Sequence, residues 1–146
     1  MKLSYSLLVL LTIVSAEGVA AQVPGTSTRP GVGPGFDLEQ NYPNPFNPET
    51  TIPFTLDADL FTSGNPVLVS LRIFNLLSQP VAFPVALSHP VGHGVEVRNL
   101  EYSQPGRHEA FWDGTDQSGQ QVASGIYFMQ LTVNGQSLSR RMYVLK

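Results

Sequence analysis

The last quarter of the chain contains the pattern that most restricts its fold. Apolar and polar residues alternate over residues 125–133 and again over residues 138–145, and a period of two is typical of a strand with one buried face. Asn134-Gly135 lies between the two runs and is the strongest short signal for a β-hairpin. We therefore expect an antiparallel pair whose inner face carries Tyr127, Met129, Leu131 and Val133.

The same alternation recurs upstream, and no segment has a helical period. It predicts strands over residues 50–56, 67–75, 81–87 and 107–112, with a short candidate at Val95-Glu96-Val97. Pro53 and Pro84 cannot donate to a ladder, so we expect edge strands or irregular strands there. Six or seven short strands with regular turn signals indicate an all-β antiparallel sandwich. Its expected inward residues are Ile52, Phe54, Leu56, Val69, Leu71, Ile73, Val81, Phe83, Val85, Leu87, Ala110 and Trp112.

Residues 37–48 contain three X-Pro pairs, at Pro43, Pro45 and Pro48. Each proline fixes its own φ and pushes the preceding residue toward an extended conformation. The segment should be stiff and non-helical, and Tyr42 and Phe46 are then available to anchor it onto the sheets.

The first residues have the order of a secretory signal peptide. Lys2 precedes an apolar run over residues 7–14, and Val19-Ala20-Ala21 supplies small residues for cleavage after Ala21. The alternative is a membrane anchor, but the run is shorter than the ~20 residues that a spanning helix needs. Residues 22–36 are rich in Gly, Pro, Ser and Thr, which predicts a flexible linker. We expect an exported chain without a membrane span after cleavage.

Composition excludes several classes of function. The net charge is −3, and cleavage after Ala21 would remove one base (Lys2) and one acid (Glu17) and leave it unchanged. Because no basic patch is present, we expect no binding to nucleic acid. Cysteine is absent, which excludes thiol catalysis and cysteine-ligated metals and leaves burial to stabilise the domain.

The residues that could carry chemistry have simpler interpretations. Asp113 and Asp116 are candidate calcium ligands in the loop 113–119, but two carboxylates make a sparse set. We favour the alternative that these side chains bond to nearby backbone amides. His89 and His93 have a zinc-chelating spacing only on a helix, which Pro90, Gly92 and Gly94 oppose.

Aromatic and histidine side chains of the later strands favour structural roles over catalysis. Trp112 is expected to anchor the core, and the Tyr127 hydroxyl to bond to the backbone as in a tyrosine corner. His108 alternates with Ala110 and Trp112, which favours a packed or half-exposed side chain. No nucleophile elbow accompanies the serines, so we expect no enzymatic activity and no cofactor.

Three groups of residues resemble the type A C-terminal sorting domain of the type IX secretion system. The first is Asn41-Tyr42-Pro43-Asn44-Pro45-Phe46. The second is Trp112-Asp113-Gly114, followed by Gly119 and then by Ser124-Gly125-Ile126-Tyr127-Phe128. The third is the tail Arg140-Arg141-Met142-Tyr143-Val144-Leu145-Lys146. The resemblance covers residues 37–146, and the stretch 112–128 is also similar to the immunoglobulin-like domain of flagellar hook-capping proteins.

The resemblance implies a seven-stranded immunoglobulin-like β-sandwich that serves as a non-enzymatic export address. Outer-membrane secretion machinery would recognise it after passage through the periplasm, and the product would reach the cell surface or the medium. In this family the domain is often cleaved off and the cargo is joined to surface lipopolysaccharide, which is therefore a further candidate partner.

The terminal strand holds the candidate recognition residues that the resemblance implies: Arg140, Arg141, Met142, Val144 and Lys146. An edge strand with free backbone groups can pair with a receptor strand, and nearby cations can orient the complex. The alternative is that these charges only protect an edge strand against aggregation.

The chain departs from the family pattern in two places. Ser78-Gln79-Pro80 stands where the family usually has Gly-Arg-Glu, and residues 88–105 are longer than the usual turn. Only residues 22–36 stand where a cargo is expected, so either a cargo has been lost or the domain is itself the product. The alternative function is an extracellular adhesive or structural immunoglobulin-like module. A role in the flagellum is opposed by the secretory signal.

Overall fold

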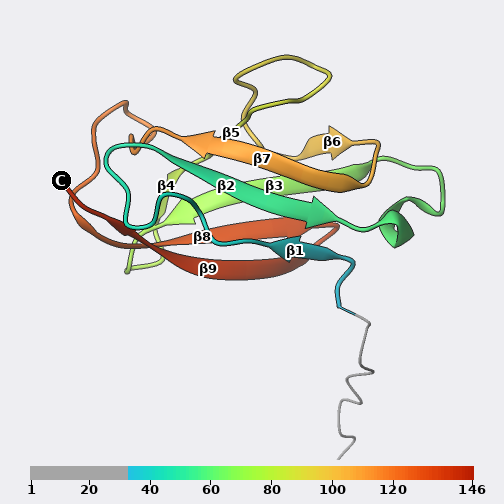
Figure 1. Cartoon of the computed structure of the whole chain (residues 1–146), viewed down its shortest axis with the longest axis horizontal. Helices are drawn as coiled ribbons and strands as arrows, with labels where there is room; N and C mark the ends of the chain where they lie inside the picture. The colour runs from blue at the N-terminus through green and yellow to red at the C-terminus, as the bar shows by residue number, and fades with distance from the viewer. Residues whose placement is uncertain (1–32) are drawn as a thin grey trace, which may run out of the picture. The chain divides into compact units, whose positions relative to one another are not determined.

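The computed structural model describes residues 33–146, so the expected signal peptide and most of the expected linker lie outside the described residues. Residues 33–146 contain one short 3-10 helix and no α-helix. No helix in this part of the chain is long and apolar enough to cross a membrane. Their elements, drawn in Figure 1, are β1 (Phe36–Leu38), β2 (Thr50–Leu56), the short 3-10 helix η1 (Ala58–Phe61), β3 (Val67–Phe74), β4 (Pro80–Ala82), β5 (Val85–Ala86), β6 (Leu100–Tyr102), β7 (Gly106–Trp112), β8 (Gly125–Val133) and β9 (Gln136–Val144).

The strands form two sheets in which every pairing is antiparallel (Figure 1). The four-stranded sheet has the order β1-β2-β7-β5, and the five-stranded sheet has the order β4-β3-β8-β9, with β6 paired to the start of β3. Within the described residues, β1 and β9 are the edge strands on one side of the fold, where they contact each other.

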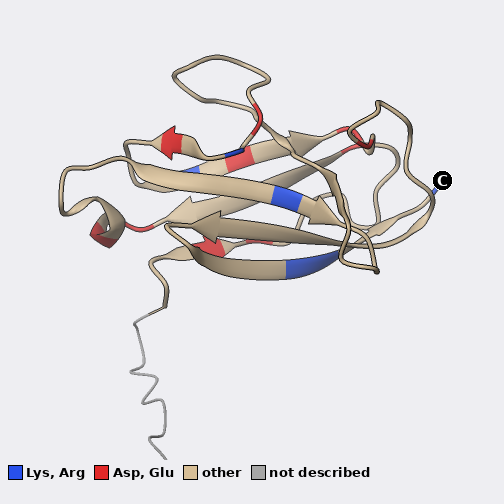
Figure 2. Cartoon of the chain, turned by 180° about the vertical axis from the view of Figure 1, so that it is seen from behind, with Lys and Arg blue, Asp and Glu red and all other residues tan. Residues whose placement is uncertain are grey.

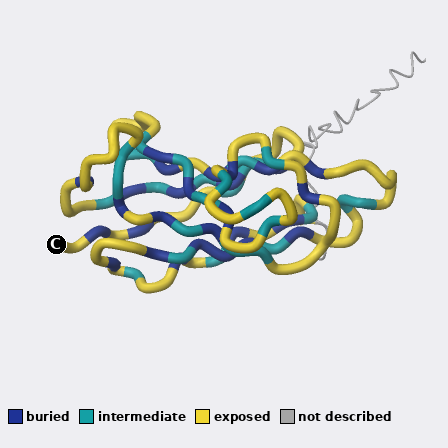
Figure 3. The backbone as a smooth tube through the Cα atoms, turned by 90° about the horizontal axis from the view of Figure 1, so that it is seen from above, coloured by how far each residue is buried: buried dark blue, intermediate teal, exposed yellow. Residues whose placement is uncertain are grey.

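Both sheets contribute to one hydrophobic core, and buried residues alternate with exposed ones along the long strands (Figure 3). The alternation arises because successive side chains of a strand point to opposite faces. The buried side chains of the longest strands are Ile52, Phe54 and Leu56 of β2, Val67, Val69, Leu71 and Ile73 of β3, Ala110 and Trp112 of β7, Tyr127, Met129, Leu131 and Val133 of β8, and Met142 and Val144 of β9.

The C-terminal hairpin forms as the sequence predicts. Val133 pairs with Gln136 across the two-residue turn, in which Asn134 has φ 47° and Gly135 has φ 84°. Both values lie in the left-handed region that a type I′ turn requires. The turn fixes the register, and every second residue of β8 is therefore buried.

The all-β antiparallel class is confirmed, but the described residues form nine strands rather than seven. The segment 81–87 divides into β4 and β5, which lie in different sheets. β1 and β6 were not expected. Val95-Glu96-Val97 forms only one isolated bridge, between Glu96 and Val85. Phe36, the last residue of the expected linker, lies in β1 and is buried.

The predicted inward face of residues 81–87 is wrong. The buried residues there are Ala82, Pro84 and Ala86, whereas the larger side chains at 81, 83 and 85 are only partly buried and Leu87 is exposed. The chain crosses from one sheet to the other in this stretch, and residues 82, 84 and 86 face the core there. Arg98 covers the Phe83 ring, 3.9 Å from its centroid. The predicted edge position is confirmed, since β4 and β5 end their sheets.

The sequence predicts an edge strand or an irregular strand around Pro53, and the first alternative is wrong, because β2 lies between β1 and β7. The irregularity that the proline requires falls on the β1 side. The Glu39 amide donates to the Pro53 carbonyl (3.0 Å), and the next backbone contact there joins Tyr42 to Thr51. Pro53 has no amide with which to donate to Glu39 in return. The pairing of β1 with β2 ends at this point, and the chain leaves β1.

Candidate functional site

The proline run, which we define as residues 41–48, connects the two sheets at one end of the fold. Tyr42 exchanges two backbone hydrogen bonds of 2.9 Å with Thr51 of β2. Four residues later, the Phe46 amide donates to the Tyr143 carbonyl and the Leu145 amide donates to the Phe46 carbonyl, each at 3.0 Å. The run therefore pairs with an inner strand of one sheet and with the end of the other sheet's edge strand.

The side chain of Phe46 inserts into the core at this point. It is 1% exposed, and its ring packs edge to face against Trp112, 5.4 Å between centroids. Trp112 packs against Tyr127 in the same way, at 5.9 Å. The Trp112 indole donates to the Thr115 carbonyl (2.8 Å), and the Tyr127 hydroxyl donates to the Ala123 carbonyl (3.0 Å). Both aromatic residues therefore have the structural roles that the sequence predicts.

The loop that follows Trp112-Asp113 requires a glycine at position 114. It has φ 74°, and a Cβ atom at this position would lie 2.3 Å from the Pro48 carbonyl oxygen. Any larger residue would push the end of the proline run away from the loop. We call the assembly of residues 41–48, residues 112–114, Tyr127 and residues 143–145 the junction.

Asn41 fastens the start of the proline run from within. It is 2% exposed, and its amide donates to Thr50 Oγ1 (3.0 Å) and to the Pro43 carbonyl (3.1 Å). The Gln40 amide donates both to Asn41 Oδ1 (2.7 Å) and to the Arg141 carbonyl (3.0 Å). Among the described residues, no buried side-chain polar atom lacks a partner, so the run is held at little desolvation cost.

The residues that carry the family resemblance divide into a buried and an exposed group. Asn41, Phe46, Trp112 and Tyr127 are buried in or beside the junction, whereas Tyr42, Pro43, Pro45, Asp113 and Gly125 are exposed and Asn44 is half-buried. Tyr42 was expected to help anchor the segment, and its backbone does pair with Thr51, but its side chain is 48% exposed rather than packed in the core. The buried members of the motif therefore build the fold, and the exposed members remain accessible to a partner.

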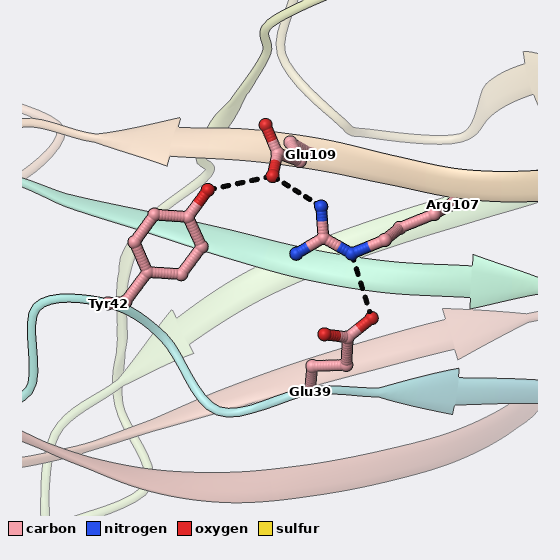
Figure 4. A network of polar contacts seen from close by, with 4 residues as sticks. All are labelled: Glu39, Tyr42, Arg107 and Glu109. Carbon is pink, nitrogen blue, oxygen red and sulfur yellow. Dashed lines mark hydrogen bonds and ion pairs between the residues drawn. The ribbon is translucent and has the colours of Figure 1, made fainter.

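Tyr42 instead belongs to a polar network on the outer face of the four-stranded sheet (Figure 4). Its hydroxyl donates to Glu109 Oε1 (2.7 Å), Arg107 bonds to the same oxygen (2.6 Å), and Arg107 Nε bonds to Glu39 Oε1 (3.2 Å). The Tyr42 hydroxyl and the Arg107 guanidinium hold the pKa of Glu109 below its ordinary value, and the bond to Glu109 raises the pKa of Tyr42. This network was not predicted from the sequence, although Arg107 and Glu109 share one face of a predicted strand.

The candidate recognition residues of β9 do not form one exposed set. Met142 and Val144 are buried in the core, so a partner of the folded domain cannot reach their side chains. Arg140, Arg141 and Lys146 are exposed. Arg140 Nε donates to the Leu38 carbonyl of β1, which links the edges of the two sheets.

The expectation of free backbone groups along the terminal residues is wrong over residues 142–146. The outward amide of Tyr143 donates to Asn44 Oδ1 (3.0 Å), and its carbonyl accepts from Phe46. The Leu145 amide donates to Phe46, and the Lys146 amide donates to Ser124 Oγ (3.0 Å). The proline run covers this part of the edge.

The loop 113–119 has the geometry of side chains that cap nearby amides. Asp113 Oδ1 accepts from the amide and the hydroxyl of Thr115 (3.0 and 2.6 Å). Asp116 Oδ1 accepts from the amide and hydroxyl of Ser118 and from the Gln120 amide. The bond from the Ser118 hydroxyl is the main reason that the pKa of Asp116 is lowered. In residues 33–146, no group of three acidic, histidine or cysteine side chains is placed to hold a metal.

The histidines lie in loops and strands, and two of them share one aromatic partner. The rings of His89 and His108 lie 4.9 and 4.6 Å from the ring of Tyr102, measured between centroids. Burial raises the pKa of Tyr102 to about 12 and lowers the pKa of His108. His89 and His93 are not on a helix, and each bonds to a backbone carbonyl.

Comparison with known proteins gives two similar solved structures. No protein-family model matches this sequence, and no curated protein matches it. PorZ, described as an essential bacterial surface component of the type IX secretion system of Porphyromonas gingivalis, is 19% identical with a TM-score of 0.42 over 77% of this chain. The alkylpurine DNA glycosylase AlkC of Pseudomonas fluorescens, bound to DNA with an abasic site analogue, is 14% identical with a TM-score of 0.45, also over 77%. The similar regions are 12% and 31% of those chains.

Proposed function

We propose that this chain is a non-enzymatic domain that addresses a protein for export by an outer-membrane secretion apparatus of the type IX class. The observation that carries the proposal is the junction. The three groups of residues that resemble the sorting domain are far apart in sequence, yet Phe46 contacts Trp112 and pairs with the backbone of Tyr143 and Leu145. The motif thus describes one packed unit, as expected for a domain whose family signature is its fold.

The proposal includes an immunoglobulin-like architecture. Two antiparallel sheets enclose one core, and the bond from Tyr127 to the Ala123 carbonyl supports a tyrosine-corner arrangement. We further propose that cleavage after Ala21 releases the chain into the periplasm, from which it reaches the cell surface or the medium. The proposed partners are the secretion machinery and, for surface attachment, lipopolysaccharide.

A reporter fusion tests the proposal. Residues 22–146 are placed behind a periplasmic reporter in a host that possesses the type IX apparatus, with the reporter alone as the control. We expect the fused reporter on the surface or in the medium and the control in the periplasm. A fusion that is folded but stays in the periplasm would overturn the proposal.

An extracellular adhesive or structural module is the second candidate. It is favoured by the burial of Asn41, Phe46, Trp112 and Tyr127, because residues that build a core serve any module of this fold. The same fusion separates the two functions. An adhesive module would bind its target when supplied as a purified protein and would not relocate the reporter.

A further inference from the structure

β9 is the edge strand of the five-stranded sheet, and its backbone groups point alternately toward β8 and away from it. The turn pairs Val133 with Gln136, so the even-numbered residues of β9 bond to β8. The odd-numbered residues point outward, as the outward bonds of Tyr143 and Leu145 show. The backbone groups of Ser137, Ser139 and Arg141 therefore also point away from β8.

The proline run covers only the last part of this edge. It satisfies the outward groups of Tyr143 and Leu145, and Gln40 reaches the carbonyl of Arg141. Within residues 33–146, no partner bonds to the backbone amides of Ser137, Ser139 and Arg141 or to the carbonyls of the two serines. All three residues are exposed. An open ladder of five residues remains, which is an ordinary length for one strand.

The charged residues of β9 itself are basic, whereas Asp37 lies on β1, which contacts β9. β3, β8 and β9 contain Arg72, Arg140 and Arg141 and no aspartate or glutamate. Figure 2 shows blue segments on β3 and β9 and red segments on β6 and β1. In the described part of the chain, Arg141 forms no ion pair. Its neighbour across the ladder is Phe128 of β8.

These observations select the kind of partner. Free amides and carbonyls that alternate along an edge are satisfied by another extended backbone, which excludes a glycan or a lipid as the direct occupant of the ladder. A second copy that paired edge to edge would bring only further arginines to this edge, because β9 contains no aspartate or glutamate that could pair with Arg141. A strand with acidic side chains fits both the backbone and the charge.

We propose that the edge of β9 over residues 137–141 accepts an added strand from a partner protein, and that this strand carries acidic side chains that face Arg141. The identity of the partner as a component of the export apparatus rests on the proposed function. The chemistry of the site does not, since strand addition can be measured on the purified chain. The proline run then has a second role, because it sets where the added strand must stop.

Amide NMR on the purified full-length chain tests the proposal with two short capped peptides, one alternating threonine with glutamate and the other alternating threonine with lysine. Before addition, the amide protons of Ser137, Ser139 and Arg141 should exchange rapidly and those of Tyr143 and Leu145 slowly. The glutamate peptide at millimolar concentration should shift and protect the first three amides. It should bind about fivefold more tightly than the lysine peptide at low salt.

Matched variants separate the backbone from the charge. Ser139→Pro removes one outward donor and should abolish protection, whereas Ser139→Thr keeps the donor and should bind normally. Arg141→Ala should weaken binding about two- to fivefold, and Arg98→Ala, which removes an arginine elsewhere, should not. If Ser139→Pro fails to fold, the comparison of Arg141→Ala with Arg98→Ala alone tests the proposal.

The outcome that overturns the proposal is an absence of shifts at residues 137–141, shifts centred elsewhere, or equal binding of both peptides. A fused reporter that is exported while the peptide does not bind would end this inference and leave the proposed function intact. Peptide binding by a domain that does not direct export would overturn the proposed function and leave this inference intact.

Discussion

The ring of Phe46 meets the ring of Trp112 edge to face, with 5.4 Å between the centroids and 61° between the planes. One residue belongs to the proline run and the other ends β7, so this contact joins the start of the domain to its middle. The backbone of Phe46 meanwhile pairs with residues 143–145. A single side chain and its peptide groups thus tie together all three sequence elements of the resemblance.

Phe46→Ala should destabilise the domain by about 3–5 kcal/mol, because it empties a fully buried aromatic site and loosens the proline run. Urea unfolding measured by tryptophan fluorescence would give this value, and Trp112 itself reports on the site. Phe128→Ala is the matched control, since the same truncation on the partly exposed outer face should cost distinctly less. Equal costs would mean that the junction is not a focus of stability.

Gly114→Ala should cost about 2–5 kcal/mol in unfolding free energy. A positive φ costs a side chain about 1–2 kcal/mol, and the Cβ atom must also displace the Pro48 carbonyl. Gly119→Ala provides the comparison, because Gly119 also has a positive φ (80°) but no atom lies within 4 Å of its Cβ position. Their difference isolates the close approach of the proline run, and identical losses would contradict it.

Local patterns predicted the parts of this fold that local chemistry decides. Asn134-Gly135 sets the register of its own hairpin, and the alternation of residues 67–75 needs only one buried face. Features that depend on residues far apart in the sequence could not be predicted in this way. The inner face of residues 81–87 depends on a crossing between sheets, and the protection of the C-terminal edge depends on Asn44 and Phe46, nearly a hundred residues away. Tyr42 was expected to help anchor the segment, but its surface position, where its hydroxyl donates to Glu109, depends on a residue 67 positions away.

Stability should decrease as the pH falls below about 6.5, the ordinary pKa of histidine. Burial lowers the pKa of His108, so the unfolded chain binds this proton more readily than the folded one. The contribution is therefore complete above the ordinary pKa and is lost as the pH falls through the lower folded value. The urea midpoint measured at about pH 7.5 and about pH 5.5 should reveal the decrease. Both pH values lie well above the range in which Glu109 and Asp116 titrate.

His108→Phe should reduce that dependence on pH. The replacement keeps a ring against Phe54 and Tyr102 but cannot bind a proton, while His89 remains beside Tyr102. His93→Gln, at an exposed position, serves as the control and should leave the dependence unchanged. A full wild-type slope in the His108 variant would assign the effect to other groups.

Removal of residues 142–146 should unfold or strongly weaken the domain rather than only disable an export signal. The deletion takes away the core side chains of Met142 and Val144 and both backbone partners of Phe46. Loss of one such methionine side chain alone costs about 2–5 kcal/mol. Thermal unfolding followed by circular dichroism would show this, and a truncated domain that melts like the full chain would contradict the packing.

Recognition must therefore be tested with a change that leaves the fold intact, and Arg141 is better suited to this than Arg140. Arg140 bonds to the Leu38 carbonyl, whereas the exposed Arg141 side chain has no hydrogen-bond or ion-pair partner among residues 33–146. Arg141→Ala should change the unfolding free energy by less than about 0.5 kcal/mol and should reduce surface delivery of the fused reporter. Arg98→Ala, at another exposed arginine, should deliver normally. If both variants melt and deliver like the wild type, Arg141 only protects the edge of β9 against aggregation and is not a recognition residue.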